Sequence, residues 1–143
     1  MSAPPQPLTA KERDLLVLVA RGLSNANIAR KLNLSEQTVK SHLQHIGTKL
    51  GARRRAAMVR AACAAGALAP KPPRGPAPVL TLEERFLLRR AGNGASLREI
   101  SRELCVSYGT AKARARDLCS TLRAVNLPQA VGHASGWGLL SAD

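Results

Sequence analysis

Apolar residues recur every three or four positions along short stretches of residues 8–68, which is the spacing of an amphipathic helix. The first stretch begins at Thr9, which can form a capping box with Glu12, and ends at Gly22. Ser24 and Ser35 stand where the second and third helices begin, because serine side chains cap free backbone N–H groups. The apolar faces of these three helices are formed by Leu15, Leu18, Val19, Ile28, Ala29, Leu32, Val39, Leu43, Ile46 and Leu50.

A fourth helix is expected next, in a segment rich in small residues. Gly51 closes the third helix, and the fourth runs from about Arg54 to Ala65 and ends at Gly66. The pattern therefore predicts a unit of four helices over residues 8–68, too small to enclose a deep pocket.

The same pattern occurs a second time further along the chain, and a single shift without any gap, which brings Leu8 onto Leu80, superposes the two copies. About a third of the positions from Leu8 to Leu68 are identical to their partners in this second copy. A duplicated unit over residues 80–140 follows, with Pro128 near the start of its last helix. The identical pairs include Glu12 and Glu84, Gly22 and Gly94, Ser24 and Ser96, Ile28 and Ile100, and Ser35 and Ser107.

The two copies are separated by residues 69–79, with the sequence APKPPRGPAPV. Proline opposes helix formation and favours an extended chain, so this segment is interpreted as a linker between domains. Its eleven residues, at about 3.1 Å each, span roughly 34 Å, close to one turn of B-DNA. Residues 1–7 are expected to form a flexible N-terminus.

Composition favours helices throughout, because alanine is abundant and β-branched residues are sparse. The expected fold class is all-α, with two tandem four-helix units joined by a proline-rich linker. Aromatic residues make up 2% of the chain, too few to form stacking platforms for single strands. Duplex DNA is therefore a better partner than RNA loops.

The chain is strongly basic, with 22 Lys and Arg residues against 9 Asp and Glu and a formal net charge of +13. This imbalance favours a polyanionic partner, and nucleic acid ahead of an anionic membrane surface. The sequence has no apolar run of membrane-spanning length and no signal-peptide pattern at its start. We therefore expect a cytoplasmic, nucleoid-associated protein with no membrane partner.

No cofactor, metal or catalytic site is expected. The three cysteines, Cys63, Cys105 and Cys119, have neither paired nor metal-ligand spacing and are interpreted as reduced thiols, the last two in ordinary packing. The sequence shows no phosphate-binding glycine loop, no acid pair and no nucleophile with a base, which argues against an enzyme.

The third helix of the first unit offers a polar face that suits DNA. If its apolar residues face the core, helical geometry places Lys40, Ser41 and Gln44 on the outer side. A helix in the major groove presents such side chains to base edges, where Lys and Gln hydrogen-bond to guanine and adenine. Lys40 and Gln44 are therefore the first candidates for reading bases. The residues expected to hold phosphates are Thr38, Lys49, Arg53, Arg54 and Arg55.

The motifs LTxxE, GLSN, IAxxLxLSxxTVKxH and KLG follow one another in residues 8–68. In this order and spacing they resemble the LuxR/GerE helix-turn-helix family along the whole unit. The resemblance implies a recognition helix from about Ser35 to Leu50, with Lys40, Ser41 and Gln44 at its base-contacting positions. His42 stands where the family often has histidine and is interpreted as a phosphate or capping contact.

The resemblance also bears on oligomeric state. It implies that the fourth helix pairs with another subunit, which would make the protein a homodimer. One departure is Asn27, where the family usually has glutamate, and it affects a local salt bridge. The candidate dimerisation residues are Val59, Ala62 and Gly66.

Residues 80–140 resemble the same family more distantly, and they are also similar to the DNA-binding region 4 of sigma factors. The recognition helix of this copy is expected from about Tyr108 to Leu122. Eleven basic and three acidic residues in 8–68, against nine and five in 80–140, favour the first unit as the stronger DNA binder. The candidate residues of the second unit are Lys112 and Arg116 for bases and Thr110 and Arg114 for phosphates.

The sequence therefore favours a sequence-specific transcription regulator that binds duplex DNA through one or both recognition helices. The alternative is a protein-interaction module, in which the second unit binds a sigma factor, RNA polymerase or another regulator. Ala111, Ala113 and Ala115 keep this alternative open, because small side chains suit flat packing between helices.

Overall fold

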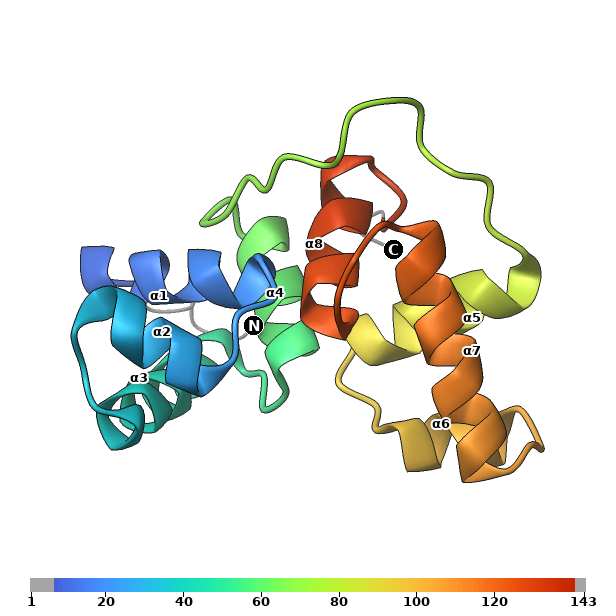
Figure 1. The fold of residues 1–143 in the computed structure, drawn as a ribbon, viewed down its shortest axis with the longest axis horizontal. Coiled ribbons are helices and arrows are strands. Elements are labelled where there is room, and N and C mark those ends of the chain that lie inside the picture. Colours follow the sequence, from blue (N-terminus) through green and yellow to red (C-terminus); the bar gives the residue numbers. More distant parts are fainter. Residues whose placement is uncertain (1–6, 141–143) are drawn as a thin grey trace, which may run out of the picture.

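The computed structural model describes residues 7–140, and all regular secondary structure in this range is helical (Figure 1). The expected all-α class is confirmed for these residues. Residues 1–6 of the expected flexible N-terminus lie outside the described range. The helices are α1 (Ala10–Ala20), α2 (Asn25–Leu32), α3 (Glu36–Leu50), α4 (Arg55–Ala64), α5 (Leu82–Gly92), α6 (Leu97–Glu103), α7 (Tyr108–Thr121) and α8 (Leu127–Gly136).

Helix ends lie where the local sequence signals predict them. At the start of α1, the Glu12 backbone N–H donates to Thr9 Oγ1 at 3.1 Å, and the Thr9 backbone N–H donates to Glu12 Oε1 at 2.9 Å. Ser24 and Ser35 cap α2 and α3, each by accepting from the backbone N–H three residues on. Gly51 ends α3 in the left-handed conformation, with a φ of 67°. The predicted caps are therefore confirmed.

The described helices form two sets of four whose bounds are related by the same shift that brings Leu8 onto Leu80. α5 and α8 have the bounds of α1 and α4 after this shift, and α6 and α7 each end one residue earlier than shifted α2 and α3. We call α1–α4 the first half and α5–α8 the second half. Leu50, expected in the core, is half-buried. Equivalent side chains fill the two cores, among them Leu15, Leu16, Ile28 and Ile46 in the first half and Leu87, Leu88, Ile100 and Leu118 in the second.

α4 and α8 pack against each other at the centre of the molecule (Figure 1), and each also contacts the first helix of the other half. The side chain of Cys63 on α4 lies close to that of Ser135 on α8, which is the equivalent position in the second half. A residue that contacts its own equivalent lies near a two-fold axis, so an approximate two-fold axis relates the halves. The fully buried residues of this pair of helices include Val59, Ala62, Val131 and Ala134.

The packing of α4 corrects the expected role of this helix as a contact with another subunit. Val59 and Ala62 have no exposed surface, because α8 of the same chain covers them. Gly66, the third candidate, is exposed beyond the end of α4. The apolar face that was expected to form a homodimer is thus occupied within one chain.

Two further hydrogen bonds between the halves are reciprocal. Arg54 Nε donates to the Gly94 carbonyl at 3.1 Å, and Asn126 Nδ2 donates to the Gly22 carbonyl at 3.1 Å. Asn126 and Gly94 are the second-half equivalents of Arg54 and Gly22, so the two bonds are equivalent under the two-fold axis. Gly22 also needs to be glycine, because a Cβ there would lie 2.5 Å from Cγ2 of Val125.

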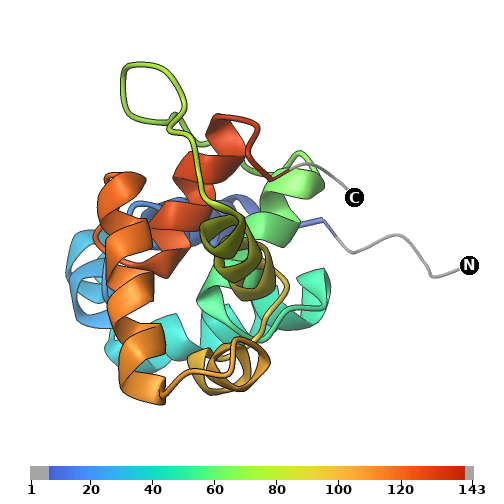
Figure 2. The same cartoon turned by 90° about the vertical axis from the view of Figure 1, so that its right-hand side faces the viewer.

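The segment between α4 and α5 crosses the molecule on one side, above α8 in Figure 1 and at the top of Figure 2. Residues 69–79 contain no helix or strand. The segment contacts the second half, where Arg123 Nη1 donates to the Arg74 carbonyl at 2.8 Å. The separation of the halves is therefore set by the packing of α4 on α8, and the reach of the linker does not determine it.

An ion pair holds the last turn of α3 against the start of α1. Lys49 Nζ lies 2.6 Å from Glu12 Oε1, and the Glu12 side chain is 7% exposed. Burial raises the pKa of Glu12, but hydrogen bonds from Lys49 and the Thr9 backbone outweigh it and bring the pKa below its ordinary value of 4.5. In the second half Thr121 replaces Lys49, and its hydroxyl donates to Glu84 at 3.4 Å. Lys49, expected at a DNA phosphate, thus has a partner inside the fold.

Asn33 and Cys105 are equivalent residues that follow α2 and α6, and both have a φ of 58°. Asparagine tolerates this left-handed conformation, whereas cysteine gains no local hydrogen bond to offset the crowding of its Cβ. Cys119 is buried, in line with the ordinary packing expected of both cysteines, whereas Cys105 is exposed. The conformation at residue 105 is therefore imposed by the surrounding turn.

We expect Cys105→Asn to raise the free energy of unfolding by about 0.5–1 kcal/mol, because asparagine adopts the left-handed conformation at a lower energetic cost than cysteine. Urea unfolding followed by circular dichroism would measure the change. Cys105→Ala is the matched control, since it removes the thiol and keeps the strained Cβ. Equal stability of the Asn and Ala variants would contradict the explanation.

We expect Glu12→Gln to lower the free energy of unfolding at pH 7 by about 1–2 kcal/mol, because glutamine can still cap α1 but cannot pair with the Lys49 ammonium. Glu84→Gln, which has no lysine partner, should lose less. A carboxyl with a lowered pKa contributes stability above its unfolded pKa and loses it as the pH falls through the folded pKa. The deficit of Glu12→Gln should therefore shrink below about pH 4.5 in urea titrations, and a deficit that does not change with pH would argue against the ion pair.

Candidate DNA interface

A tight turn between α2 and α3 sets the angle between these two helices. Asn33 takes the left-handed conformation, and the Leu34 backbone N–H donates to the Ala29 carbonyl at 2.8 Å. Ile28 of α2 and Val39 of α3 are fully buried. Because one side of α3 is held against the core in this way, its opposite side faces solvent.

The outer face of α3 carries a group of polar side chains. Lys40 and Gln44 lie one helical turn apart and are exposed, and Ser41 is half-buried beside them. Gln37 and His45 are exposed on the same helix. The three residues predicted to read bases in the first half are thus together on one helix, and their contact with DNA stays a prediction.

The three consecutive arginines after α3 have different surroundings. Arg53 is exposed, lines the same surface hollow as Gln44 and has no side-chain hydrogen bond within residues 7–140. Arg54 is exposed but donates to the second half. Arg55 is half-buried, and its Nη1 donates to the Leu23 carbonyl at 3.1 Å. Arg53 is therefore the arginine of this run that is best placed for a phosphate.

Thr38 and His42 are half-buried on the first two turns of α3. Thr38 Oγ1 lies 2.8 Å from Ser35 Oγ, and the Thr38 backbone N–H donates to the same Ser35 oxygen at 3.0 Å. Thr38 thus belongs to the cap of the helix, where an anion would also meet the positive end of the helix dipole.

The equivalent face of α7 is also polar, but its composition differs. Lys112 and Arg116 are exposed on its outer side. The ring of Tyr108 lies between two cations, with Arg98 Cζ 4.3 Å and Lys112 Nζ 4.9 Å from the ring centroid. This group was not predicted from the sequence, although the spacing of four between Tyr108 and Lys112 places them one turn apart.

The residues around α7 offer fewer groups for phosphates than those around α3. Arg114 is half-buried and forms an ion pair with Glu83, and Thr110 is bonded to the capping Ser107 at 2.9 Å. Val125 stands at the position equivalent to Arg53 and is 76% exposed. The second half therefore has a less basic rim beside its polar helix face.

Residues 7–140 contain no helix with the length and apolar character needed to cross a membrane. Within the same range, no three histidine, cysteine or acidic residues are grouped so that they could hold a metal ion.

Part of the first half matches a known protein family. Residues 6–62 match the family described as bacterial regulatory proteins, luxR family. This range contains α1, α2 and α3 and most of α4, so it includes the exposed face of α3. No solved structure matches the chain at a comparable level of significance.

Relatives match a short part of the chain. The nitrate/nitrite response regulator protein NarL of Escherichia coli K12 is 51% identical over 43 residues, which are 30% of this chain and 20% of NarL. The response regulator NarP of the same organism is 52% identical over 50 residues, 35% of this chain and 23% of NarP. A Mycobacterium tuberculosis protein named as an HTH-type transcriptional regulator is 46% identical over 59 residues, 41% of this chain and 7% of that protein. The chain thus spans a minor part of each of these relatives.

The motifs and the family match agree for this part of the chain. Residues 6–62 match the luxR family of bacterial regulatory proteins, and the chain is similar to proteins named as regulators.

Proposed function

We propose that the protein is a sequence-specific transcription regulator that places α3 in the major groove of duplex DNA. The observation that carries this proposal is the exposed polar face of α3, within a domain of the LuxR family. Lys40 and Gln44 would read base edges, with Ser41 beside them, and Arg53 would hold a phosphate at the groove edge. In this role the protein would act on the bacterial nucleoid, in the cytoplasm.

The second half is proposed to be a divergent domain of the same type, so that the chain comprises domains at 8–68 and 80–140 and a linker at 69–79. The repetition of the helix bounds from the first half to the second supports this organisation. The Cys63–Ser135 contact and the equivalent bonds of Arg54 and Asn126 support a two-fold arrangement of the domains. One chain would then present two recognition helices, α3 and α7.

The two helices carry unlike side chains at equivalent positions. Gln44 on α3 corresponds to Arg116 on α7, and Ser41 corresponds to Ala113, whereas Lys40 and Lys112 are the same. Glutamine favours adenine and arginine favours guanine in the major groove. The proposed DNA site therefore consists of two different half-sites, and no second copy of the protein is needed to read both.

A second candidate function for α5–α8 is contact with another protein of the transcription machinery, such as a sigma factor or RNA polymerase. The observation in its favour is Val125, an exposed apolar side chain where the first half has Arg53. Ala113 adds a small exposed residue on α7. An apolar rim favours a protein surface over a phosphate backbone.

We expect Gln44→Ala to weaken binding to the preferred site by about 1–3 kcal/mol and to relax the preference at one base pair, with little change in salt dependence. Arg53→Ala should instead weaken all sequences alike and lower the slope of log affinity against log salt by about one. Arg74→Ala, which removes a charge from the linker, is the control for net charge. Fluorescence anisotropy at several salt concentrations would separate the two effects, and identical behaviour of both variants would contradict the placement of α3.

Selection from random duplex DNA tests the proposed pair of recognition helices. The intact chain is expected to enrich two unlike half-sites at a fixed spacing, with one chain per DNA by native mass spectrometry. Lys40→Ala with Gln44→Ala should remove one half-site, and Lys112→Ala with Arg116→Ala the other. Enrichment of a single half-site that is unchanged in the Lys112→Ala, Arg116→Ala variant would favour the protein-contact function of α5–α8. No enrichment at all would refute sequence-specific DNA binding.

A further inference from the structure

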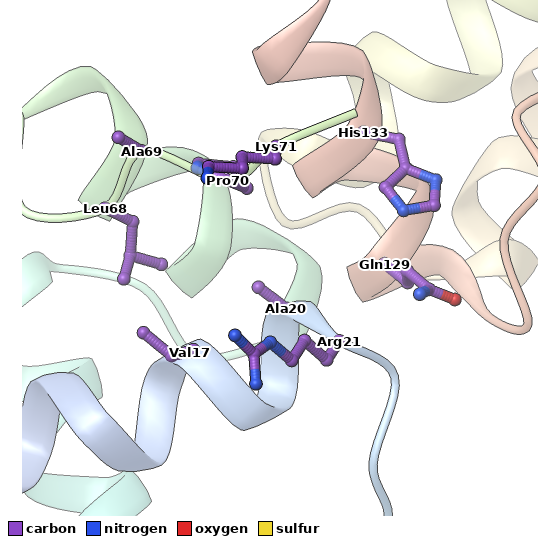
Figure 3. Close-up of a pocket in the computed structure, with 9 residues that line it drawn as sticks. All are labelled: Val17, Ala20, Arg21, Leu68, Ala69, Pro70, Lys71, Gln129 and His133. Carbon is purple, nitrogen blue, oxygen red and sulfur yellow. The ribbon is translucent and has the colours of Figure 1, made fainter. Parts of the chain in front are cut away.

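A pocket of about 380 Å³ lies where the two halves meet. Figure 3 shows that its walls come from three segments, namely the end of α1, the chain just after α4, and α8. This pocket exists because the halves pack together, since both halves contribute to its lining. Pockets of this size at domain boundaries are common sites for small molecules. The lining residues are Val17, Ala20, Arg21, Leu68, Ala69, Pro70, Lys71, Gln129 and His133.

The lining combines an apolar surface with positive charge. Leu68 and Ala20 are buried, and Val17 and Pro70 are half-buried, so they form an apolar wall. Arg21 and Lys71 provide the charge, and no acidic residue lines the pocket. Such a lining suits a ligand with an apolar body and a negative group.

Neither cation of the pocket is neutralised by an acidic side chain of the described residues. Within residues 7–140 the side chains of Arg21 and Lys71 form no ion pair, unlike Lys49, Arg90 and Arg114. An arginine guanidinium binds a carboxylate through two parallel hydrogen bonds, which an ammonium on a flexible stem can supplement.

His133 and Gln129 complete the polar part of the lining. His133 Nδ1 lies 2.8 Å from the Leu122 carbonyl, an atom that can only accept, so Nδ1 is the donor and Nε2 is an acceptor in the neutral ring. Gln129 Oε1 accepts from the Val125 backbone N–H at 2.8 Å, which leaves its amide N–H groups as donors. The Gln129 amide therefore supplies donors that suit an anion, whereas Nε2 of a neutral His133 can only accept.

We propose that this pocket binds a small organic carboxylate and that binding adjusts the orientation of one half relative to the other. The ligand would contact α1 of the first half and α8 of the second, so it would bridge the two halves. In Figures 1 and 2 the segment after α4 lies on the side of the molecule away from α6 and the start of α7. A ligand there would leave the outer faces of α3 and α7 clear. The effect on DNA rests on the proposed function, whereas binding to the pocket does not.

Trp137, the single tryptophan of the chain, gives a direct signal for binding. Its ring packs edge-on against His133, with centroids 6.2 Å apart. Titration of the DNA-free protein with benzoate should change Trp137 emission, with a dissociation constant on the order of 1 mM for so small a probe. Benzamide, the neutral analogue, and inorganic phosphate, an anion with no apolar body, should bind at least about tenfold more weakly. No response to benzoate, or equal responses to all three probes, would overturn the proposal.

Variants of the lining residues test whether the change in Trp137 emission comes from binding in the pocket. Arg21→Ala and Lys71→Ala should each weaken benzoate binding by about fivefold, and Ala69→Phe should block it by filling the space. Lys11→Ala is the matched control, since it removes an exposed cation from the other end of α1. Circular dichroism confirms that each variant folds. Unchanged benzoate binding in both cation variants would overturn the assignment of the pocket.

The effect on DNA is measured separately, with the selected two-part site. Saturating benzoate is expected to change its affinity at least about threefold in the intact chain and not in Arg21→Ala. Benzoate binding without any change in DNA affinity would overturn the regulatory part of the proposal. Failure of the chain to bind DNA would refute the proposed function and leave the Trp137 result as it stands.

Discussion

The packing of α4 against α8 is the interaction on which the rest of the structure depends. Both helices are rich in small residues, so their apolar faces meet closely and leave Val59 and Val131 without exposed surface. The direction of α3 relative to α7 follows from this contact, because each half is rigidly built on its own fourth helix. The bonds of Arg54 and Asn126 add two reciprocal contacts between the halves. The pocket beside His133 is a further product of the same contact.

Much of the fold could be predicted from the sequence, because its signals are local. Capping by Thr9, Ser24 and Ser35 depends on residues only three positions apart, and Gly51 ends α3 through its own backbone. The spacing of apolar residues every three or four positions then predicted which face of each helix is buried, as with Leu15 and Ile46. The internal repeat extended these signals to a second half whose individual motifs are weaker.

The partners of charged side chains could not be predicted, because they come from distant parts of the chain. Lys49 and Arg54 look alike in sequence, yet one bonds to a carboxylate 37 residues away and the other to a carbonyl 40 residues away. Arg53 differs from both because its side chain has no hydrogen bond within residues 7–140. The sequence also could not identify the partner of Val59, because packing on a second subunit and packing on α8 would bury the same apolar face of α4. At residue 105, identity alone did not reveal that the turn requires a left-handed backbone.

The covalent joining of the two halves has a consequence for how the protein responds to its own abundance. Two separate subunits dissociate on dilution, so the amount of paired species falls with roughly the square of the concentration when copies are few. In this chain α4 and α8 stay at a high effective concentration for each other, however few molecules a cell holds. Occupancy of a two-part DNA site would then rise in simple proportion to copy number, without a threshold set by assembly.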